Sequence, residues 1–252
     1  MSLLVVEDLT KSFGGVHAVR SVGFALDRGE RLAIIGPNGA GKTTCFNMVG
    51  GQLEADAGTV RLDGEDVTHL KPHRIWAKGV GRTFQVAASF GSMSVVENVQ
   101  MALLSHERRL RALLPSARRL YRDRALELLA RVDMADQAER AMGVLAYGDV
   151  KRVELAIALA HDPKLLLMDE PTAGMAARER HALMDLTTSI VRERGVALLF
   201  TEHDMDVVFR NADRILVLAR GAIVAEGPPE AIRADPEVQA IYLGHGFEEI
   251  PL

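Results

Sequence analysis

Residues 36–44 constrain the fold of this chain more than any other stretch. They read Gly-Pro-Asn-Gly-Ala-Gly-Lys-Thr-Thr and fit the phosphate-binding pattern of glycine, four residues and Gly-Lys-Ser/Thr. The apolar run 32–35 before them predicts a buried strand, and residues 45–49 after them predict a helix start. Glycines let the backbone curl around a polyphosphate with its N–H groups pointing inward, and the helix dipole adds positive potential. The alternative, a glycine-rich turn between strand and helix, is less favoured because chance rarely produces the four fixed positions.

The side chains of this loop suggest how phosphate and metal would be held. In this pattern the lysine, here Lys42, contacts the β- and γ-phosphates, and the next hydroxyl, here Thr43, contacts Mg²⁺. The candidate nucleotide-binding residues of the loop are Gly36, Asn38, Gly39, Ala40, Gly41, Lys42, Thr43 and Thr44. The stretch therefore predicts a nucleotide site that also uses Mg²⁺.

The composition is that of an ordinary soluble globular protein. The 252 residues are 48% hydrophobic and 25% charged, which suffices for one large α/β domain or two small ones. A net charge of -4 argues against a bulk polyanion such as nucleic acid as a partner. The single cysteine, Cys45, cannot form an internal disulfide, which is consistent with a cytosolic setting. Since no stretch approaches the roughly 18 apolar residues of a membrane span, work at a membrane would require a partner.

The order of expected elements predicts an α/β fold with a mostly parallel core sheet. The chain opens with an antiparallel pair of strands at 3–6 and 19–26, which predicts a small antiparallel portion. Further strands are expected at residues 58–62, 165–168, 196–200, 215–218 and 222–225. Residues 86–160 have helical periodicity and no good strand. We therefore predict one domain, 1–252, with an α/β core at 1–85 and 161–252 and an inserted helical subdomain at 86–160.

Two carboxylates follow the apolar run 165–168. Asp169 is the natural Mg²⁺ ligand beside a phosphate loop, and Glu170 is the natural base for the water that attacks the γ-phosphate. The alternative is that the two residues merely end the strand and lead into a turn at Pro171. Because a phosphate loop is expected in the same sheet, the catalytic interpretation is favoured.

Three further residues are weak candidates when each is considered alone. A histidine at a strand end, here His203, is more often a solvated or capping residue than a catalytic one. Gln85 follows an aromatic residue, which by itself means little. Phe13 could stack on adenine, but an aromatic residue between two strands more often packs in the core. These residues gain weight only together.

In their order and spacing along the chain, these residues and the motifs around them resemble the ATPase subunits of ATP-binding cassette transporters. The resemblance covers nearly the whole chain. It is carried by Phe13, residues 36–44, Gln85, residues 145–149, residues 165–170, residues 173–175 and His203. The resemblance implies that Phe13 stacks on the adenine of ATP, that Lys42, Thr43 and Thr44 hold phosphates and Mg²⁺, and that Asp169 is the Mg²⁺ carboxylate. It also implies that Gln85 contacts the metal and the water and senses the membrane partner, that Glu170 is the hydrolytic base, and that His203 responds to the γ-phosphate.

The family site is composite, because a signature segment of one ATPase completes the phosphate site of a second. Here the segment is Ala146, Tyr147, Gly148 and Asp149, whereas the family usually reads Leu-Ser-Gly-Gly-Gln from position 145. Ala146 replaces the serine, and a lost charge-assisted hydrogen bond is typically worth about 1.5 to 3 kcal/mol. Backbone N–H groups and the helix dipole remain. We therefore expect a working ATPase that turns over more slowly or dimerises more weakly.

Several local features are similar to the ATPase subunits of branched-chain amino acid importers. They are residues 81–85, Tyr147, residues 171–175, residues 202–205 and residues 242–244. The similarity implies integral-membrane permease subunits, a second ATPase in a homo- or heterodimer, and indirectly a periplasmic or extracellular substrate-binding protein. It places the chain in the cytoplasm, peripheral on the inner face of the cell membrane. The ATPase does not touch the cargo, so no residue encodes it.

Two other functions are compatible with the residues alone. One is a soluble cassette ATPase that acts as an assembly or mechanical factor without a permease, and the other is a non-catalytic nucleotide-binding regulator. A cluster of seven arginines also allows two interpretations, a solvated helix face or a surface for permease loops or anionic lipid headgroups. Its members are Arg108, Arg109, Arg111, Arg118, Arg119, Arg122 and Arg124.

Overall fold

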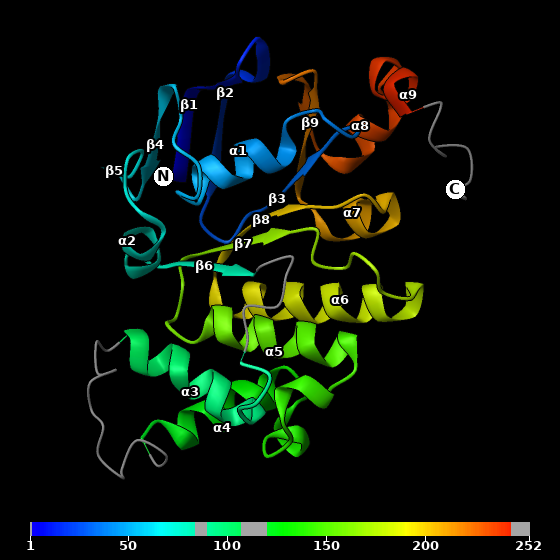
Figure 1. Cartoon of the computed structure of the whole chain (residues 1–252). Helices are drawn as coiled ribbons and strands as arrows, with labels where there is room; N and C mark the ends of the chain where they lie inside the picture. The colour runs from blue at the N-terminus through cyan, green and yellow to red at the C-terminus, as the bar shows by residue number, and fades with distance from the viewer. Residues whose placement is uncertain (1, 84–89, 107–119, 243–252) are drawn as a thin grey trace.

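Two β-sheets form the scaffold of the computed structural model, which describes residues 2–83, 90–106 and 120–242 (Figure 1). The larger sheet has the strand order β10-β9-β3-β8-β7-β6. Its strands are β3 (Arg31–Ile35), β6 (Val80–Thr83), β7 (Leu165–Asp169), β8 (Ala197–Thr201), β9 (Arg214–Ala219) and β10 (Ala222–Gly227). All neighbouring pairs are parallel except β9 and β10, so the expected mostly parallel core sheet is confirmed.

The central strands of this sheet are apolar except at their ends, because both of their faces are covered. In β3, Ala33 and Ile35 face one hydrophobic cluster, and Leu32 and Ile34 face the other. β7 and β8 alternate in the same way, and every residue of these two strands is buried. Polar side chains are therefore concentrated where the strands end.

The smaller sheet is antiparallel and confirms the predicted pair at the start of the chain. Its order is β2-β1-β4-β5, from β1 (Ser2–Phe13), β2 (Val16–Asp27), β4 (Ala57–Leu62) and the unpredicted β5 (Glu65–Asp66). Helix α1 (Lys42–Val49) packs between the two sheets, because its buried residues share a hydrophobic cluster with both. Cys45 is fully buried in this layer, and burial raises the pKa of its thiol to about 12.

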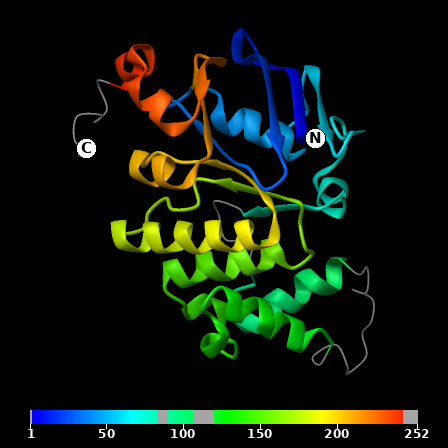
Figure 2. The ribbon, with the colours of Figure 1, turned by 180° about the vertical axis from the view of Figure 1, so that it is seen from behind.

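The remaining helices cover the other face of the large sheet and the ends of the molecule (Figure 2). They are α2 (Pro72–Ala77), α3 (Val95–His106), α4 (Arg122–Arg131), α5 (Tyr147–Leu159), α6 (Ala177–Arg194), α7 (Met205–Asn211), α8 (Pro229–Ala234) and α9 (Pro236–Tyr242). Helix α7 was not predicted. It begins because the Asp204 carboxylate accepts hydrogen bonds from the N–H groups of Asp206 and Val207.

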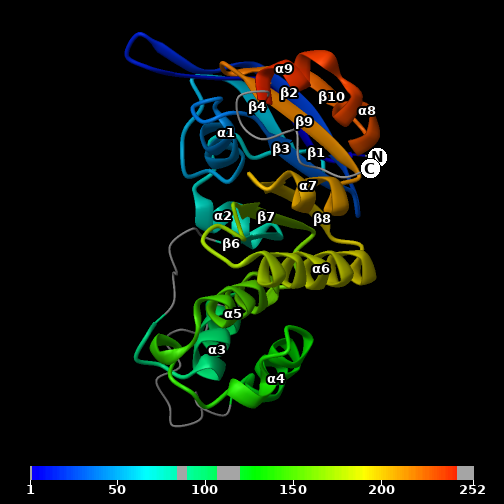
Figure 3. The ribbon, with the colours of Figure 1, turned by 90° about the vertical axis from the view of Figure 1, so that its right-hand side faces the viewer.

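Helices α3, α4 and α5 pack on one another and form a helical block beyond α6, away from the antiparallel sheet (Figure 3). Helix α5 of the block packs against α6 and β6, and three rings near α2 join the block to the core as well. The Trp76 ring centroid lies 4.6 Å from that of His161 and 5.3 Å from that of His106. Burial and then the neighbouring His106 lower the pKa of His161 to about 4.

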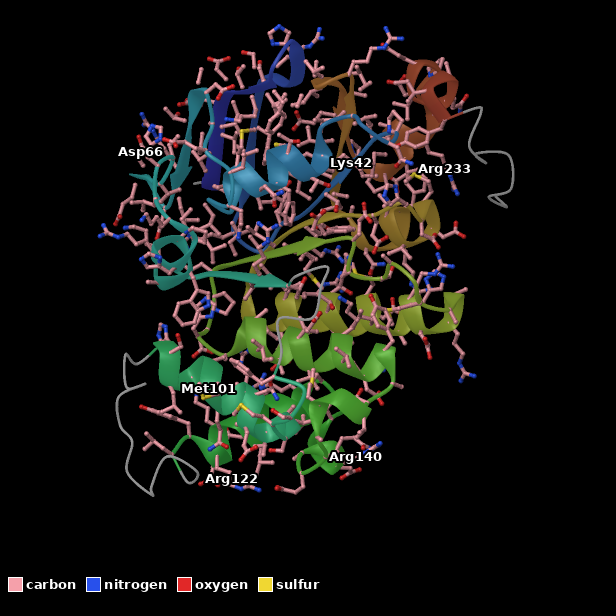
Figure 4. The ribbon with its side chains drawn as sticks, in the orientation of Figure 1. Lys42, Asp66, Met101, Arg122, Arg140 and Arg233 are labelled. Atoms are coloured by element: carbon pink, nitrogen blue, oxygen red, sulfur yellow. The ribbon has the colours of Figure 1, made fainter. Side chains whose placement is uncertain are left out.

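Most of the arginine cluster lies outside the described residues, as do Gln85 and residues 243–244. Of the cluster, Arg122 forms an ion pair with Glu139, and Arg124 forms one with Asp162. Figure 4 labels Arg122 at the far side of the helical block from Lys42. The two described arginines therefore lie on a solvated surface remote from the phosphate loop.

Candidate functional site

The loop between β3 and α1 requires glycine at the places where it passes other backbone. Gly36 has φ of 152°, and a Cβ there would lie 2.1 Å from the Leu218 carbonyl oxygen. Gly41 has φ of 101°, and a Cβ there would lie 2.3 Å from the Ala18 carbonyl oxygen. The turn between β9 and β10 closes the same loop, since the Gly221 N–H donates to the Ala40 carbonyl at 3.0 Å. Backbone contacts thus fix the loop before any ligand arrives.

The Lys42 ammonium is held inside this loop. Its Nζ donates to the Gly36 carbonyl at 2.6 Å and to the Pro37 carbonyl at 3.2 Å. Burial lowers the pKa of Lys42, and the charges of Glu170 and Asp169 partly offset this effect. The ammonium is therefore aimed into the loop by carbonyl groups, which an anionic ligand can replace.

A cavity of about 350 Å³ opens over the loop at the carboxyl ends of the strands, where ligands of open α/β sheets bind. Figure 4 labels Lys42 at the end of α1 that begins this site. Its walls bring together residues from four separate parts of the sequence, and all of them except Ala18 were predicted to belong to the site. They are Phe13, Ala18, Asn38, Gly39, Ala40, Gly41, Lys42, Thr43, Thr44, Glu170 and His203. Gly36 lies in the same loop, buried below the cavity wall.

Asp169 and Glu170 lie at the end of β7, and a threonine of the next strand connects them. Asp169 is 5% exposed, and its Oδ1 accepts a 2.6 Å hydrogen bond from the Thr201 hydroxyl. The Glu170 N–H donates to the Thr201 Oγ1 at 3.0 Å and to the Thr201 carbonyl at 3.2 Å. Glu170 has φ of 48°, a left-handed conformation that turns the chain sharply out of the strand.

Glu170, the predicted base, is in direct contact with His203, which is predicted to respond to the γ-phosphate. His203 Nε2 lies 2.6 Å from Glu170 Oε1. The His203 side chain is 48% exposed and that of Glu170 is 18% exposed. Two residues 33 positions apart in the sequence therefore meet at the mouth of the cavity.

A buried carboxylate, Glu202, fixes the loop that carries His203. Its Oε1 accepts from the Thr172 N–H at 2.9 Å and from the Thr172 hydroxyl at 2.7 Å, and its Oε2 accepts from the His203 N–H at 3.2 Å. Burial raises the pKa of Glu202, and these hydrogen bonds act in the opposite direction. The loops after β7 and β8 are thus joined through one side chain.

Phe13 belongs to the cavity and not to the core. Its side chain is 51% exposed at the end of β1, with the Lys11 ammonium 5.7 Å from the ring centroid. An exposed aromatic face beside the phosphate loop is suited to stacking on a nucleobase. The core-packing alternative for Phe13 is therefore wrong, and its contact with adenine stays a prediction.

The segment 146–149 is the start of α5. Ala146 is the N-cap residue, with φ of -64° and ψ of 152° and no side-chain capping bond, and Tyr147 is the first helical residue. Tyr147 is 49% exposed, and a Cβ on Gly148 would lie 3.5 Å from the Met175 side chain. In the described part of the chain, residues 146–149 do not line the cavity over the phosphate loop. They lie beside the loop that follows β7, with the unpaired N–H groups of a helix start.

The residues of the site fit Mg²⁺. The ion takes hard oxygen ligands and usually binds through one or two protein groups together with substrate phosphates. The Thr43 hydroxyl lines the cavity, and the Asp169 carboxylate lies close enough to Lys42 to influence its pKa. Among the described residues there is no cluster of three or more His, Cys, Asp or Glu suited to a metal. A hydroxyl and a carboxylate beside the phosphate loop suit an ion that arrives with the nucleotide.

Comparison with protein families decides the class. A family model described as ABC transporter matches residues 19–173, which is more than half of the chain. The chain belongs to the ATP-binding cassette transporter family. A second model, described as branched-chain amino acid ATP-binding cassette transporter, matches residues 222–248.

Individual family members resemble the chain over nearly its full length. The high-affinity branched-chain amino acid transport ATP-binding protein BraF of Pseudomonas aeruginosa is 40% identical over 249 residues, covering 96% of this chain and 98% of BraF. A nucleotide-free ATP-binding cassette from an ABC transporter superposes with a TM-score of 0.85 at 31% identity, covering 96% of this chain and 99% of that one. A dimeric, post-hydrolysis cassette bound to ADP and Pi gives 0.76 at 27% identity, covering 90% and 98%.

The protein is thus the ATP-binding, ATP-hydrolysing subunit of an ABC transporter, as the sequence predicted. The alternatives of a soluble assembly factor and a non-catalytic regulator are not supported. Subunits of this kind act with membrane permeases and dimerise. Every helix in the described ranges is too short or too polar to cross a lipid bilayer.

Sequence reasoning missed the polar residues that hold the site together. Thr201 was given no role, and Thr172 and Glu202 were noted only within the segments 171–175 and 202–205 that are similar to branched-chain amino acid importers. A signal for Thr201 was present, because a hydroxyl ends the otherwise apolar run 197–200 of β8. In parallel register Thr201 pairs with Asp169, which places the hydroxyl beside the carboxylate.

Proposed function

We propose that the cavity over the phosphate loop binds Mg²⁺ and ATP, with the residues in the roles that the sequence suggests. The proposal is supported by the cavity lining, which brings the loop residues together with Glu170 and His203. Lys42 would exchange its bonds to the Gly36 and Pro37 carbonyls for β- and γ-phosphate oxygens. Thr43 and Asp169 would hold Mg²⁺, which neutralises charge on the phosphates when bound. Phe13 would stack on adenine. The role of Gln85, contact with the metal and the attacking water, is proposed from the sequence alone.

Hydrolysis requires a base that removes a proton from water as the water attacks the γ-phosphorus. Glu170 has the position for this role, since its carboxylate lies at the cavity and faces His203. Water adds to phosphorus, the bond to the β-phosphate oxygen breaks, and the products are ADP and Pi. His203 would move from Glu170 to the γ-phosphate when ATP enters.

The substitution Glu170→Gln tests this role. It keeps the size of the side chain and removes the base, so we expect normal ATP binding, accumulation of closed dimer, and turnover reduced about 100-fold or more. The matched control is Glu193→Gln, an exposed glutamate of α6 whose carboxylate lies 3.6 Å from the Arg131 guanidinium. Steady-state ATPase assays and size-exclusion chromatography measure the outcome. Near-normal turnover in Glu170→Gln would remove Glu170 from catalysis.

We further propose that the active unit is a head-to-tail dimer, homo- or heteromeric, in which the α5 start of one chain completes the cavity of the other. The exposed position of Tyr147 and the unpaired N–H groups at this helix start support the proposal. The division into an α/β core at 1–85 and 161–252 and a helical subdomain at 86–160 is part of the same proposal.

The cargo that we propose is branched-chain or related amino acids, imported through an integral-membrane permease with the chain on the inner face of the cell membrane. The match of residues 222–248 to the branched-chain amino acid family model supports this class. The test is purification of the tagged protein from gently solubilised membranes of its host, followed by mass spectrometry. We expect polytopic permeases, a second ATPase and an associated amino-acid-binding protein. Recovery of only soluble partners, under conditions that preserve a known transporter, would contradict the proposal.

A further inference from the structure

One hydroxyl connects the two carboxylates that the proposed function uses. The Thr201 side chain is fully buried at the end of β8, opposite Asp169 in the parallel register. Its hydroxyl proton goes to Asp169 Oδ1, so its lone pairs face the Glu170 N–H. The result is a short chain of hydrogen bonds, from the Glu170 amide through the Thr201 hydroxyl to the Asp169 carboxylate. Such a chain polarises cooperatively in a dry interior.

The carboxylate of Asp169 needs such a partner. The terminal torsion of an aspartate is broad, so packing alone does not set the plane of its two oxygens. The 2.6 Å bond from Thr201 engages Oδ1, and among the described residues Oδ2 accepts no hydrogen bond. The hydroxyl therefore selects which oxygen of Asp169 remains available to a ligand.

The Glu170 backbone needs a partner for a different reason. A non-glycine residue at φ of 48° is strained by roughly 1 to 3 kcal/mol and persists only when neighbours hold it. The Glu170 N–H is shared between the Thr201 hydroxyl at 3.0 Å and the Thr201 carbonyl at 3.2 Å. The hydrogen bond to the hydroxyl is the shorter of the two, and it is the one that a side-chain substitution can remove.

We propose that Thr201 is a positioning residue for ATP hydrolysis. Its hydroxyl orients the Asp169 carboxylate and holds the Glu170 backbone in the turn that aims the base at the cavity. The inference rests on the proposed roles of Asp169 and Glu170. Thr201 itself is fully buried and does not belong to the described lining of the cavity.

The first variant is Thr201→Val, which replaces the hydroxyl by a methyl group of similar volume. Loss of a residue that orients a metal ligand typically costs 10- to 100-fold in activity or metal affinity, so we expect turnover to fall by about that factor. The KM for ATP should change less than about twofold, because the phosphate loop is untouched. Binding of a fluorescent ATP analogue should be unchanged in EDTA, and half-maximal turnover should require a higher Mg²⁺ concentration than normal.

Two comparisons separate the hydroxyl from packing. Thr187 is also a fully buried threonine, but its hydroxyl donates at 2.8 Å to the Leu183 carbonyl within α6, so Thr187→Val is the matched control. Thr201→Ser and Thr201→Ala both lose the methyl group and differ only in the hydroxyl. We expect Thr201→Ser to restore turnover and Thr201→Ala to behave like Thr201→Val. The second pair keeps the test valid if Thr201→Val does not fold.

The outcomes distinguish this inference from the proposed function. Turnover in Thr201→Val within about twofold of normal, while Glu170→Gln is inactive, would overturn only the role of Thr201. Equal losses in Thr187→Val, or no rescue by Thr201→Ser, would also overturn it, because packing would then explain the effect. Normal turnover in Glu170→Gln would instead overturn the proposed base.

Discussion

The two halves of the proposed ATP site differ in how much of their geometry is fixed within one chain. At the sheet edge, Lys42, Asp169 and Glu170 each have hydrogen-bond partners in the protein. At the start of α5, Ala146 makes no side-chain capping bond and Tyr147 is half exposed. The first half is therefore rigid before ligand arrives, whereas the second presents backbone groups to another surface. In the dimer that we propose, this contrast would place the catalytic residues in one chain and the control of catalysis in the contact between two chains.

We expect the largest effect from a substitution that displaces the phosphate loop in the rigid half of the site. In Gly41→Ala the new Cβ would meet the Ala18 carbonyl oxygen at 2.3 Å, so the phosphate loop must shift. A displacement of about 1 Å can cost on the order of 100-fold, and we expect ATPase turnover to fall by that much. Gly195→Ala is the control, since Gly195 also has positive φ but nothing within 4 Å of a new Cβ.

In the control, only the left-handed backbone is unfavourable, at a cost of roughly 1 to 2 kcal/mol of stability. Its turnover should remain normal. If Gly41→Ala hydrolyses ATP as fast as Gly195→Ala, the phosphate loop is not rigid and the contrast between the two halves fails.

A second effect, of intermediate size, concerns the attachment of the helical block. Folded His161 has a pKa of about 4, below its ordinary value of 6.5, so the unfolded chain takes up the proton first as pH falls. The contribution of His161 to the free energy of unfolding is then fully present above about pH 6.5, and it is lost progressively as the pH falls to 4. At pH 5 the loss is about 2 kcal/mol.

Urea unfolding at pH 7, 6 and 5 measures this loss. In His161→Leu the change between pH 7 and pH 5 should shrink by about 2 kcal/mol, whatever its absolute stability. The control is His69→Gln, whose histidine is exposed on the surface. An unchanged pH dependence in His161→Leu would show that burial in the ring cluster with Trp76 and His106 does not disfavour protonation of His161 in the folded protein.

We expect the smallest effect from a substitution at the start of α5, the half of the site that faces another surface. Ala146→Ser adds a hydroxyl at the start of α5, and we expect ATP-driven dimerisation or turnover to rise by up to about tenfold, near the lower limit for a charge-assisted bond. Ala176→Ser is a matched control, because Ala176 is also an alanine N-cap with the same backbone conformation, at the start of α6.

Both serines should stabilise their helices by about 1 kcal/mol. Only Ala146→Ser should alter dimerisation, as measured by analytical ultracentrifugation with ATP. Identical behaviour of the two variants would mean that position 146 does not contact phosphate.

The sequence predicted most of the fold because its local signals agree with the tertiary structure. The buried runs before Gly36 and Asp169 became β3 and β7, and the glycine-rich loop lies between a strand and a helix as expected. Helix α7 was missed because its seven residues follow a polar strand end, and the cap at Asp204 was not considered.

The part of the site that the sequence could not give is the set of contacts between strand ends. Pairing of Thr201 with Asp169 depends on the order of β7 and β8 in the sheet, which periodicity does not reveal. The contact of Glu202 with Thr172 joins residues 30 positions apart and depends on both loops. Phe13 was ambiguous for a similar reason, since exposure depends on what packs above a strand end.

The burial of Cys45 has a practical consequence for observing how two chains meet. Because the only thiol of the chain is fully buried with a pKa of about 12, maleimide dyes should leave the unaltered protein unlabelled. A cysteine placed at Val144, which is 63% exposed just before α5, would then carry the sole fluorophore. Energy transfer between donor- and acceptor-labelled copies could follow opening and closing of the dimer in real time during the ATPase cycle.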